Sequence, residues 1–200
     1  MRDDSDESLM FRYKRGEVRA FEVLMVRHRG PIFNFIFRYT RDRTAAEDLM
    51  QETFLRLIKA VESYERSAKF TTFLYTIARN LCVDASRRGK HRQVTSLDAP
   101  VHGSEDQVPL VERIADGQKS SDGKVLDQEL GEKLKKAIEE LPDDQREIFL
   151  LREVSDLQFN EIADIVGISE NTVKSRMRYA LEKLRQSLED YRDLAQRAAP

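Results

Sequence analysis

Apolar residues recur every three or four positions through most of this 200-residue sequence, and no stretch of it alternates apolar with polar residues. The first pattern is typical of helices that bury one side, whereas alternation would indicate a strand in a sheet. We therefore predict an all-α fold. The apolar spacing predicts helices over residues 17–39, 45–61, 71–88, 125–141, 145–153 and 159–166, and a long last helix from residue 170 to about Leu194.

Residues 91–124 interrupt this periodicity and collect proline, glycine and serine with few large apolar side chains. Such a composition is typical of a linker. We predict two helical domains, residues 8–92 and 125–195, joined by an acidic flexible linker over residues 93–124. A helix-turn-helix is predicted in the C-terminal domain.

The net charge of −2 hides a strong asymmetry along the chain. Residues 8–93 carry a net charge of +9, residues 1–7 carry −3, and the rest of the chain is acidic. A basic block of this size in a nearly neutral chain indicates that one end meets a polyanion such as nucleic acid.

The spacing of small and apolar residues over 159–179 is typical of a DNA-binding helix-turn-helix. Ala163 is small enough for two helices to cross, Gly167 tolerates a left-handed turn, and Val173 anchors the second helix. Ser169 is predicted to cap that helix, whose N-terminus would then enter a major groove. The outward residues predicted to contact bases or phosphates are Thr172, Lys174, Ser175 and Arg178. The alternative is a plain helical hairpin with a solvated basic face.

Basic and aromatic residues are interleaved around the predicted helix 71–88. The basic ones are Arg79, Arg87, Arg88, Lys90 and Arg92, and the aromatic ones are Tyr64, Phe70, Phe73 and Tyr75. This mixture suits a surface that holds a nucleic-acid strand and stacks unpaired bases. The alternative is that Phe73 and Tyr75 belong to the core and that the arginines are only solvated.

The preceding helix, which we predict Thr44 to cap with Glu47 closing a capping box, has the opposite character. Its acidic and amide side chains are Glu47, Asp48, Gln51 and Glu52. Lying beside Leu49 and Phe54, they favour a surface for a basic helical element of a partner. Taken alone, the same residues also fit an ordinary solvated face.

Three motifs together resemble a known family. The segment from Ala46 to Arg56 resembles the core-binding segment of bacterial sigma factors, and the segment from Phe70 to Leu81 resembles their promoter-melting segment. Leu141–Arg146, followed by Leu151-Arg152-Glu153 and the helix-turn-helix, resembles the last sigma domain. The chain is therefore similar to a two-domain extracytoplasmic-function (ECF) sigma factor over about residues 8–190.

This resemblance implies roles for individual residues. Asp48, Gln51 and Glu52 match positions that dock on core RNA polymerase, supported by Leu49 and Phe54. Asn80 and Asp84, with Ala60, Tyr64 and Phe70, match positions that receive a flipped base of the −10 element, while Arg87 and Arg88 would hold phosphates. The positions that read the −35 element as duplex are matched by Thr172, Lys174, Ser175, Arg178 and Tyr179. Phe73 departs from the pattern, because the family usually has Trp there, and the smaller ring predicts weaker melting at poor promoters.

The resemblance implies a sigma factor that binds core RNA polymerase and directs promoter-specific transcription initiation in a stress response. Promoter DNA and core polymerase are the expected partners, together with an inhibitory anti-sigma factor. The main alternative is a helix-turn-helix regulator that binds DNA without polymerase, which would leave the motifs at 46–56 and 70–90 unused.

We expect no catalytic residue, metal or cofactor. His28, His91 and His102 lack metal-ligand spacing, and the sequence holds no motif for nucleophilic catalysis. The lone Cys82 excludes an internal disulfide and a cysteine-rich zinc site. Because the apolar runs are short and the first residues are acidic, neither membrane insertion nor a signal peptide is predicted, and the chain is expected in the cytoplasm.

Overall fold

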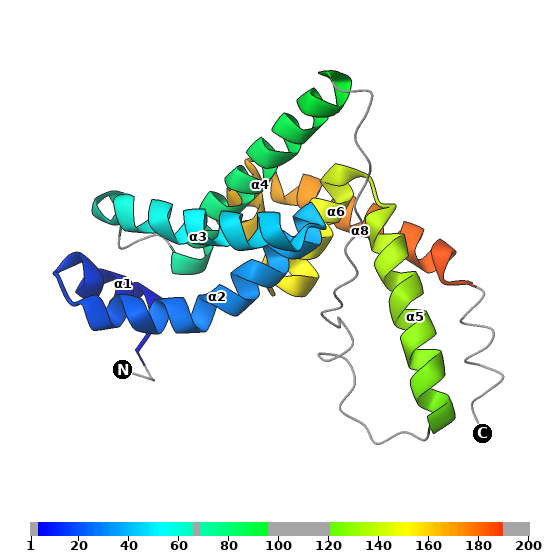
Figure 1. Ribbon diagram of the computed structural model, residues 1–200, viewed down its shortest axis with the longest axis horizontal. Helices are drawn as coiled ribbons and strands as arrows, with labels where there is room; N and C mark the ends of the chain where they lie inside the picture. The colour runs from blue at the N-terminus through cyan, green and yellow to red at the C-terminus, as the bar shows by residue number, and fades with distance from the viewer. Residues whose placement is uncertain (1–3, 66–68, 96–120, 190–200) are drawn as a thin grey trace. The chain divides into compact units, whose positions relative to one another are not determined.

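The computed structural model describes residues 4–65, 69–95 and 121–189, with side-chain environments for 4–65, 69–88 and 130–189 (Figure 1). Within these residues there is no strand, and the predicted all-α fold is confirmed. The helices are α1 (Asp6–Lys14), α2 (Val18–Thr40), α3 (Arg43–Lys59), the 3₁₀ turn η1 (Val61–Ser63), α4 (Phe70–Thr95), α5 (Ser121–Glu139), α6 (Asp143–Phe149), the π-helical turn η3 (Leu150–Val154), α7 (Phe159–Val166) and α8 (Glu170–Ser187).

The chain folds as two compact units, which confirms the predicted two-domain organisation. One unit takes in Met1–Ser104 and Leu150–Glu170, and the other takes in Glu105–Phe149 and Asn171–Pro200. Neither unit is contiguous in sequence, so the domain boundaries drawn at residues 92 and 125 stay a prediction.

In the first unit, α2 packs against α1, α3 and α4. Most of the core comes from positions of the predicted apolar spacing, and Leu9 and Met10 add to it from α1, a helix that this spacing did not predict. The largest fully buried side chains of this unit are Leu9, Met10, Leu24, Ile32, Phe35, Ile36, Leu57, Phe70, Leu74, Leu81 and Leu150. The helix α2 continues through Pro31, at the loss of the one backbone hydrogen bond that proline cannot donate.

Asp42, rather than Thr44, caps α3. The Asp42 carboxylate accepts a hydrogen bond from the Ala45 amide at 3.0 Å, so the helix begins at Arg43. The predicted capping box is therefore wrong, and Glu47 instead pairs with Arg43 at 3.2 Å. An aspartate is at least as good an N-cap as a threonine, and it comes first along the chain.

The helices extend into both ends of the predicted linker. The helix α4 runs on to Thr95 rather than ending at Arg88, and α5 begins at Ser121. A single glycine such as Gly89 costs a helix only about 1 kcal/mol, so the loss of apolar spacing there did not end α4. The remainder of the predicted linker, residues 96–120, lies outside the described residues, as do residues 190–194 of the predicted last helix.

In the second unit, α5, α6 and α8 each bury one side. The buried apolar residues are Ala137, Ile138, Leu141, Ile148, Phe149, Val173, Met177, Ala180 and Leu184. Pro142 separates α5 from α6 as predicted, because proline cannot continue the first helix and suits the start of the second. The predicted helix 145–153 is divided between α6 and η3.

Candidate functional site

The outward face of α3 carries the acidic and amide group predicted from sequence. Asp48 and Gln51 are exposed, and the Glu52 side chain is 39% exposed. Separations of three and four residues place these side chains on one face of the helix. Arg56 donates to the Glu52 carboxylate at 2.8 Å, and this bond lowers the pKa of Glu52. This face of α3 therefore presents the Glu52 carboxylate beside the exposed side chains of Asp48 and Gln51.

The two apolar residues assigned to the same interface lie deeper. Leu49 is half-buried, and Phe54 is only 4% exposed. Phe54 therefore packs into the core on the buried side of α3. The opposite, exposed side of the helix carries Asp48, Gln51 and Glu52. On the same side as these residues, Leu55 is 49% exposed.

The exposed side of α4 carries four of the residues predicted to contact the −10 element. Asn80, Asp84, Arg87 and Arg88 are all exposed. They follow one another at helical spacing, so they line one side of α4. Arg88 is oriented by a hydrogen bond from Nε to the carbonyl oxygen of Asp84, at 3.3 Å. Amide, carboxylate and guanidinium groups are thus presented to solvent together.

Tyr64 and Phe70, which were predicted to line the same base pocket, are in the core. Tyr64 is 2% exposed and Phe70 is fully buried. The Tyr64 ring lies 5.3 Å from that of Phe73 and 6.0 Å from that of Phe11, measured between centroids. Burial raises the pKa of Tyr64 to about 12, with a further contribution from the nearby charges of Glu7 and Asp6. Neither ring is available to stack a base in this conformation, and Ala60 is half-buried.

The helix α7 and the glycine turn after it agree with the prediction from the sequence. The helix α7 begins and ends at the predicted residues, Phe159 and Val166. Gly167 has a φ of +75°, a left-handed conformation that glycine adopts without strain, and its amide donates to the Ala163 carbonyl at 2.8 Å. Glu161 fixes the start of α7 by accepting from the Gln158 amide at 2.7 Å. This capping box was not predicted, although the Gln-x-x-Glu spacing of Gln158 and Glu161 is typical of one.

The helix α8 buries its apolar residues on one side and exposes its predicted DNA-contacting residues on the other. Val173, Met177, Ala180 and Leu184 are buried, as predicted. The residues predicted to read the −35 element are all exposed: Thr172, Lys174, Ser175, Arg178 and Tyr179. The helix therefore offers hydroxyl, ammonium and guanidinium groups on the face opposite its buried stripe.

Two arginines of α8 are held in different ways. The Arg178 guanidinium lies over the Tyr179 ring, 5.0 Å from its centroid, and approaches the Tyr179 hydroxyl at 3.3 Å. Arg176 is instead paired with Asp144 of α6 at 3.2 Å. Arg176 thus supports the unit from within, while Arg178 is pre-oriented on the exposed face.

Known proteins match both halves of the chain. The sigma-70 region 2 family matches residues 24–92, and the sigma-70 region 4 family matches residues 131–184. The ECF RNA polymerase sigma factor SigW of Bacillus subtilis (strain 168) is 33% identical over 177 residues, which cover 88% of this chain and 93% of SigW. The chain belongs to the ECF sigma factors of the sigma-70 family. The sigma factor CarQ of Myxococcus xanthus is also 33% identical, over 90% of this sigma factor and 95% of CarQ.

Solved structures have the same fold. The sigma factor RpoE from Bartonella quintana, in complex with the anti-sigma factor NepR, is 25% identical with a TM-score of 0.66, over 84% of this sigma factor and 96% of that chain. CnrH, solved with the cytosolic domain of CnrY, has a TM-score of 0.65 over 94% of this sigma factor and 99% of that chain, at 20% identity. The second likeness concerns the fold alone.

Two further observations concern the described residues. They contain no group of three or more His, Cys, Asp and Glu side chains that could hold a metal ion. None of their helices combines the length and the apolar character needed to cross a bilayer.

Proposed function

We propose that this sigma factor binds core RNA polymerase through α3, reads the −35 element as duplex through α8, and opens the −10 element along α4. The observation that carries the proposal is that one chain matches both sigma-70 regions and exposes a polar face on each of these helices. The polymerase supplies the chemistry of RNA synthesis, and the sigma factor contributes binding energy and orientation, without a metal or cofactor of its own.

Docking on the polymerase is assigned to Asp48, Gln51 and Glu52, with Leu49 and Phe54 supporting them from the core side. The carboxylates would meet basic side chains of a helical element of the polymerase. Charge complementarity of this kind steers association and fixes register. Because Glu52 already accepts from Arg56, docking would exchange an intrahelical ion pair for one across the interface.

Duplex recognition is assigned to Thr172, Lys174, Ser175, Arg178 and Tyr179. The N-terminal half of α8 would lie in the major groove, as the second helix of a helix-turn-helix does. Arginine fits the paired acceptors on guanine, whereas lysine and hydroxyl groups suit phosphates. The contact with Tyr179 limits the conformations of the Arg178 side chain, which lowers the entropy lost on binding.

Opening of the −10 element is assigned to the exposed side of α4. Asn80 and Asp84 would meet the edge of an extruded base, and Arg87 and Arg88 would hold the phosphates of that strand. Extruding a base costs a few kcal/mol, so a site that binds only the extruded form couples recognition to melting. Ala60, Tyr64 and Phe70 would shape this site from below.

The remaining assignments follow from the family. We propose the domain division 8–92, 93–124 and 125–195, and activity in the cytoplasm, where core polymerase and the chromosome are located. RpoE was solved with an anti-sigma factor, and we propose that a protein of that class holds this sigma factor inactive until a stress signal arrives.

Run-off transcription tests the function directly. Bacterial core polymerase is incubated with a pool of random-sequence duplexes, with and without this sigma factor, and transcripts are recovered from the templates used. Initiation at a defined set of sequences is expected only when the sigma factor is present. A sigma factor that binds duplex in the absence of polymerase, and leaves transcription start sites unchanged, would support the regulator that acts without polymerase.

Glu52→Lys tests the docking face. It removes one charge-assisted contact and adds a like charge, so we expect core affinity to fall by about 2–5 kcal/mol if the contact is desolvated. The measurement is a binding titration with core polymerase in the absence of DNA. Glu22→Lys is the matched control, since Glu22 is an exposed glutamate on another helix, α2. Equal affinities for the two variants, with unfolding temperatures close to that of the wild type, would remove Glu52 from the interface.

A further inference from the structure

The helix α1 lies before the residues matched by the region 2 family, yet it contacts the start of α4. The Phe70 amide donates to the Glu7 carboxylate at 3.0 Å. Phe70 is the first residue of α4, where amides have no partner within the helix and where negative charge is favourable. Glu7 therefore serves as a cap for α4, although 63 residues separate the two positions.

A second contact from α1 holds the segment that follows α3. Lys14 Nζ donates to the Glu62 carbonyl at 2.5 Å and lies 3.5 Å from the Tyr64 carbonyl. The same ammonium group is 3.9 Å from the Glu62 carboxylate. These carbonyls are at the end of η1, so Lys14 holds the backbone of Glu62 and Tyr64.

Between these two contacts, α1 is anchored in the core. Leu9 and Met10 are fully buried, and the Phe11 ring contacts that of Tyr64. Glu7, Phe11 and Lys14 follow one another at helical spacing, so one face of α1 touches Phe70, Tyr64 and Glu62.

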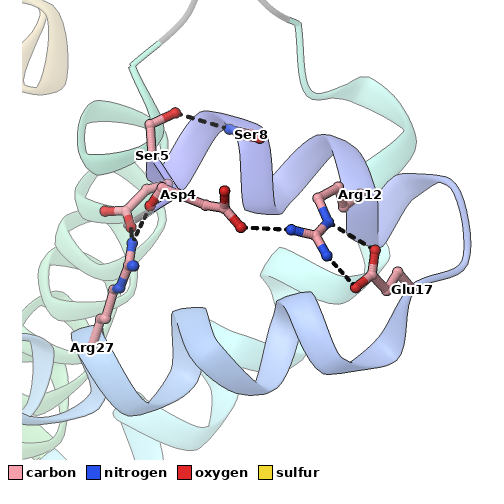
Figure 2. Close-up of polar contacts among 7 residues, drawn as sticks. Asp4, Ser5, Ser8, Arg12, Glu17 and Arg27 are labelled. Atoms are coloured by element: carbon pink, nitrogen blue, oxygen red, sulfur yellow. Dashed lines mark hydrogen bonds and ion pairs between the residues drawn. The ribbon is translucent and has the colours of Figure 1, made fainter. Parts of the chain in front are cut away.

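Polar contacts also tie α1 to α2 (Figure 2). Arg12 bridges Asp4 and Glu17, with Nε at 2.8 Å from the Glu17 carboxylate. Asp6 lies 2.7 Å from Arg27 and 2.7 Å from Nε2 of His28, whose ring contacts Phe70. Burial of the Asp6 carboxyl is outweighed by the hydrogen bonds and charges of His28 and Arg27, and its pKa is lowered. The helix is thus fastened on the side away from η1 as well.

We infer that Glu7 and Lys14 are positioning residues for promoter opening, which hold Phe70 and the backbone from Glu62 to Tyr64 in place from α1. The inference rests on the proposed role of α4 in opening the −10 element. These two residues touch no DNA in this scheme. They act through the first turn of α4 and through the backbone of Glu62 and Tyr64, which border the site assigned to the extruded base.

The test compares Glu7→Ala and Lys14→Ala in the complete holoenzyme. The template is a promoter duplex selected from a random pool by the wild-type holoenzyme, and permanganate reactivity of unpaired thymines reports opening. Loss of one hydrogen bond predicts about a two- to tenfold fall in opening on duplex for each variant. A template already mismatched over the −10 element is expected to recover part of that loss, while affinity for core polymerase is unchanged.

Charge-matched and conservative variants separate positioning from other effects. Arg15→Ala and Glu22→Ala change the charge equally at exposed positions and are expected to open the duplex as the wild type does. Glu7→Gln keeps an acceptor oxygen and Lys14→Arg keeps a donor, so both are expected to restore most of the opening. All variants are compared below their measured unfolding temperatures.

The outcomes distinguish the inference from the proposed function. If the wild-type holoenzyme opens the duplex and the two alanine variants open it equally well, the inference is wrong and the proposed function stands. The inference is equally overturned if the variants lose core affinity by the same factor as opening, because the role is then general stability. Should the wild type open neither template, both the inference and the proposed function fail.

Discussion

The two surfaces assigned to DNA differ in how much of each is accessible before DNA arrives. On α8, every residue predicted to read duplex is exposed, and the opposite stripe is buried. Around α4, the polar residues Asn80, Asp84, Arg87 and Arg88 are exposed, whereas Tyr64 and Phe70 are in the core beneath α1. A surface that reads intact duplex needs only a rigid helix face. A surface that captures an extruded base also needs apolar area, which is unfavourable to expose in water.

The cost of exposing Phe70 can be compared with the free energy gained by stacking a base on its ring. Moving a fully buried phenylalanine into water costs about 1.5–3 kcal/mol, and the cavity left behind adds to that cost. Stacking one base on an aromatic ring returns about 1–3 kcal/mol. Exposing Phe70 to stack a base therefore gives no net gain. We expect the polar side of α4 to contact the base, while Tyr64 and Phe70 hold that side in place.

The largest effect is expected on the α8 side of this comparison. Arg178→Ala should weaken binding to the preferred −35 duplex by about 1–3 kcal/mol and relax the preference at one base pair, if Arg178 is bidentate to guanine.

Lys174→Ala should weaken binding to all duplexes alike and reduce the salt slope by about 1, if Lys174 contacts phosphate. Holoenzyme affinities for a set of −35 variants at several salt concentrations measure both.

Lys183→Ala is the control for these variants, because Lys183 is an exposed cation further along α8. If Arg178→Ala discriminates among the −35 variants as well as Lys183→Ala does, the base reader on α8 has been misassigned, and another residue of the same helix reads the base pair.

A smaller effect is expected on the α4 side. Asn80→Ala removes hydrogen bonds to the base edge and leaves Arg87 and Arg88 to hold phosphates, so holoenzyme should still reach the closed complex. Opening of duplex promoter should fall about two- to tenfold. A template mismatched over the −10 element should recover part of this loss, because the cost of unpairing has been removed. Permanganate footprinting on the two templates measures the difference.

Ser86→Ala is a control on the same helix, since Ser86 is exposed on a different side of α4. If Asn80→Ala opens duplex as efficiently as Ser86→Ala does, the base site is elsewhere, and the contrast between the exposed and the buried residues loses its functional meaning.

The structural features that could be predicted from the sequence are those set by residues close together in the chain. The bounds of α7, the left-handed turn at Gly167 and the buried stripe of α8 each follow from residues within one or two turns of one another. The burial of Tyr64 was not predictable in this way, because it depends on Phe11, which is far away in sequence. The contact of Glu7 with Phe70 is similar, since an acidic residue near the N-terminus has no local pattern that names its partner.

The last prediction tests the burial of Tyr64 without DNA. The difference between pH titrations of the wild type and Tyr64→Phe, followed by tyrosinate absorbance, isolates one of the six tyrosines. Because burial raises the pKa of Tyr64 to about 12 from 10.0, its contribution to stability is complete below pH 10 and is lost as the pH rises towards 12. The wild type should therefore lose more stability than Tyr64→Phe over this range. A transition near pH 10 in a chain that is still helical by circular dichroism would mean that the ring is exposed. Tyr64 would then be accessible, as Tyr179 of α8 is, and an unpaired base of the promoter strand could stack on its ring.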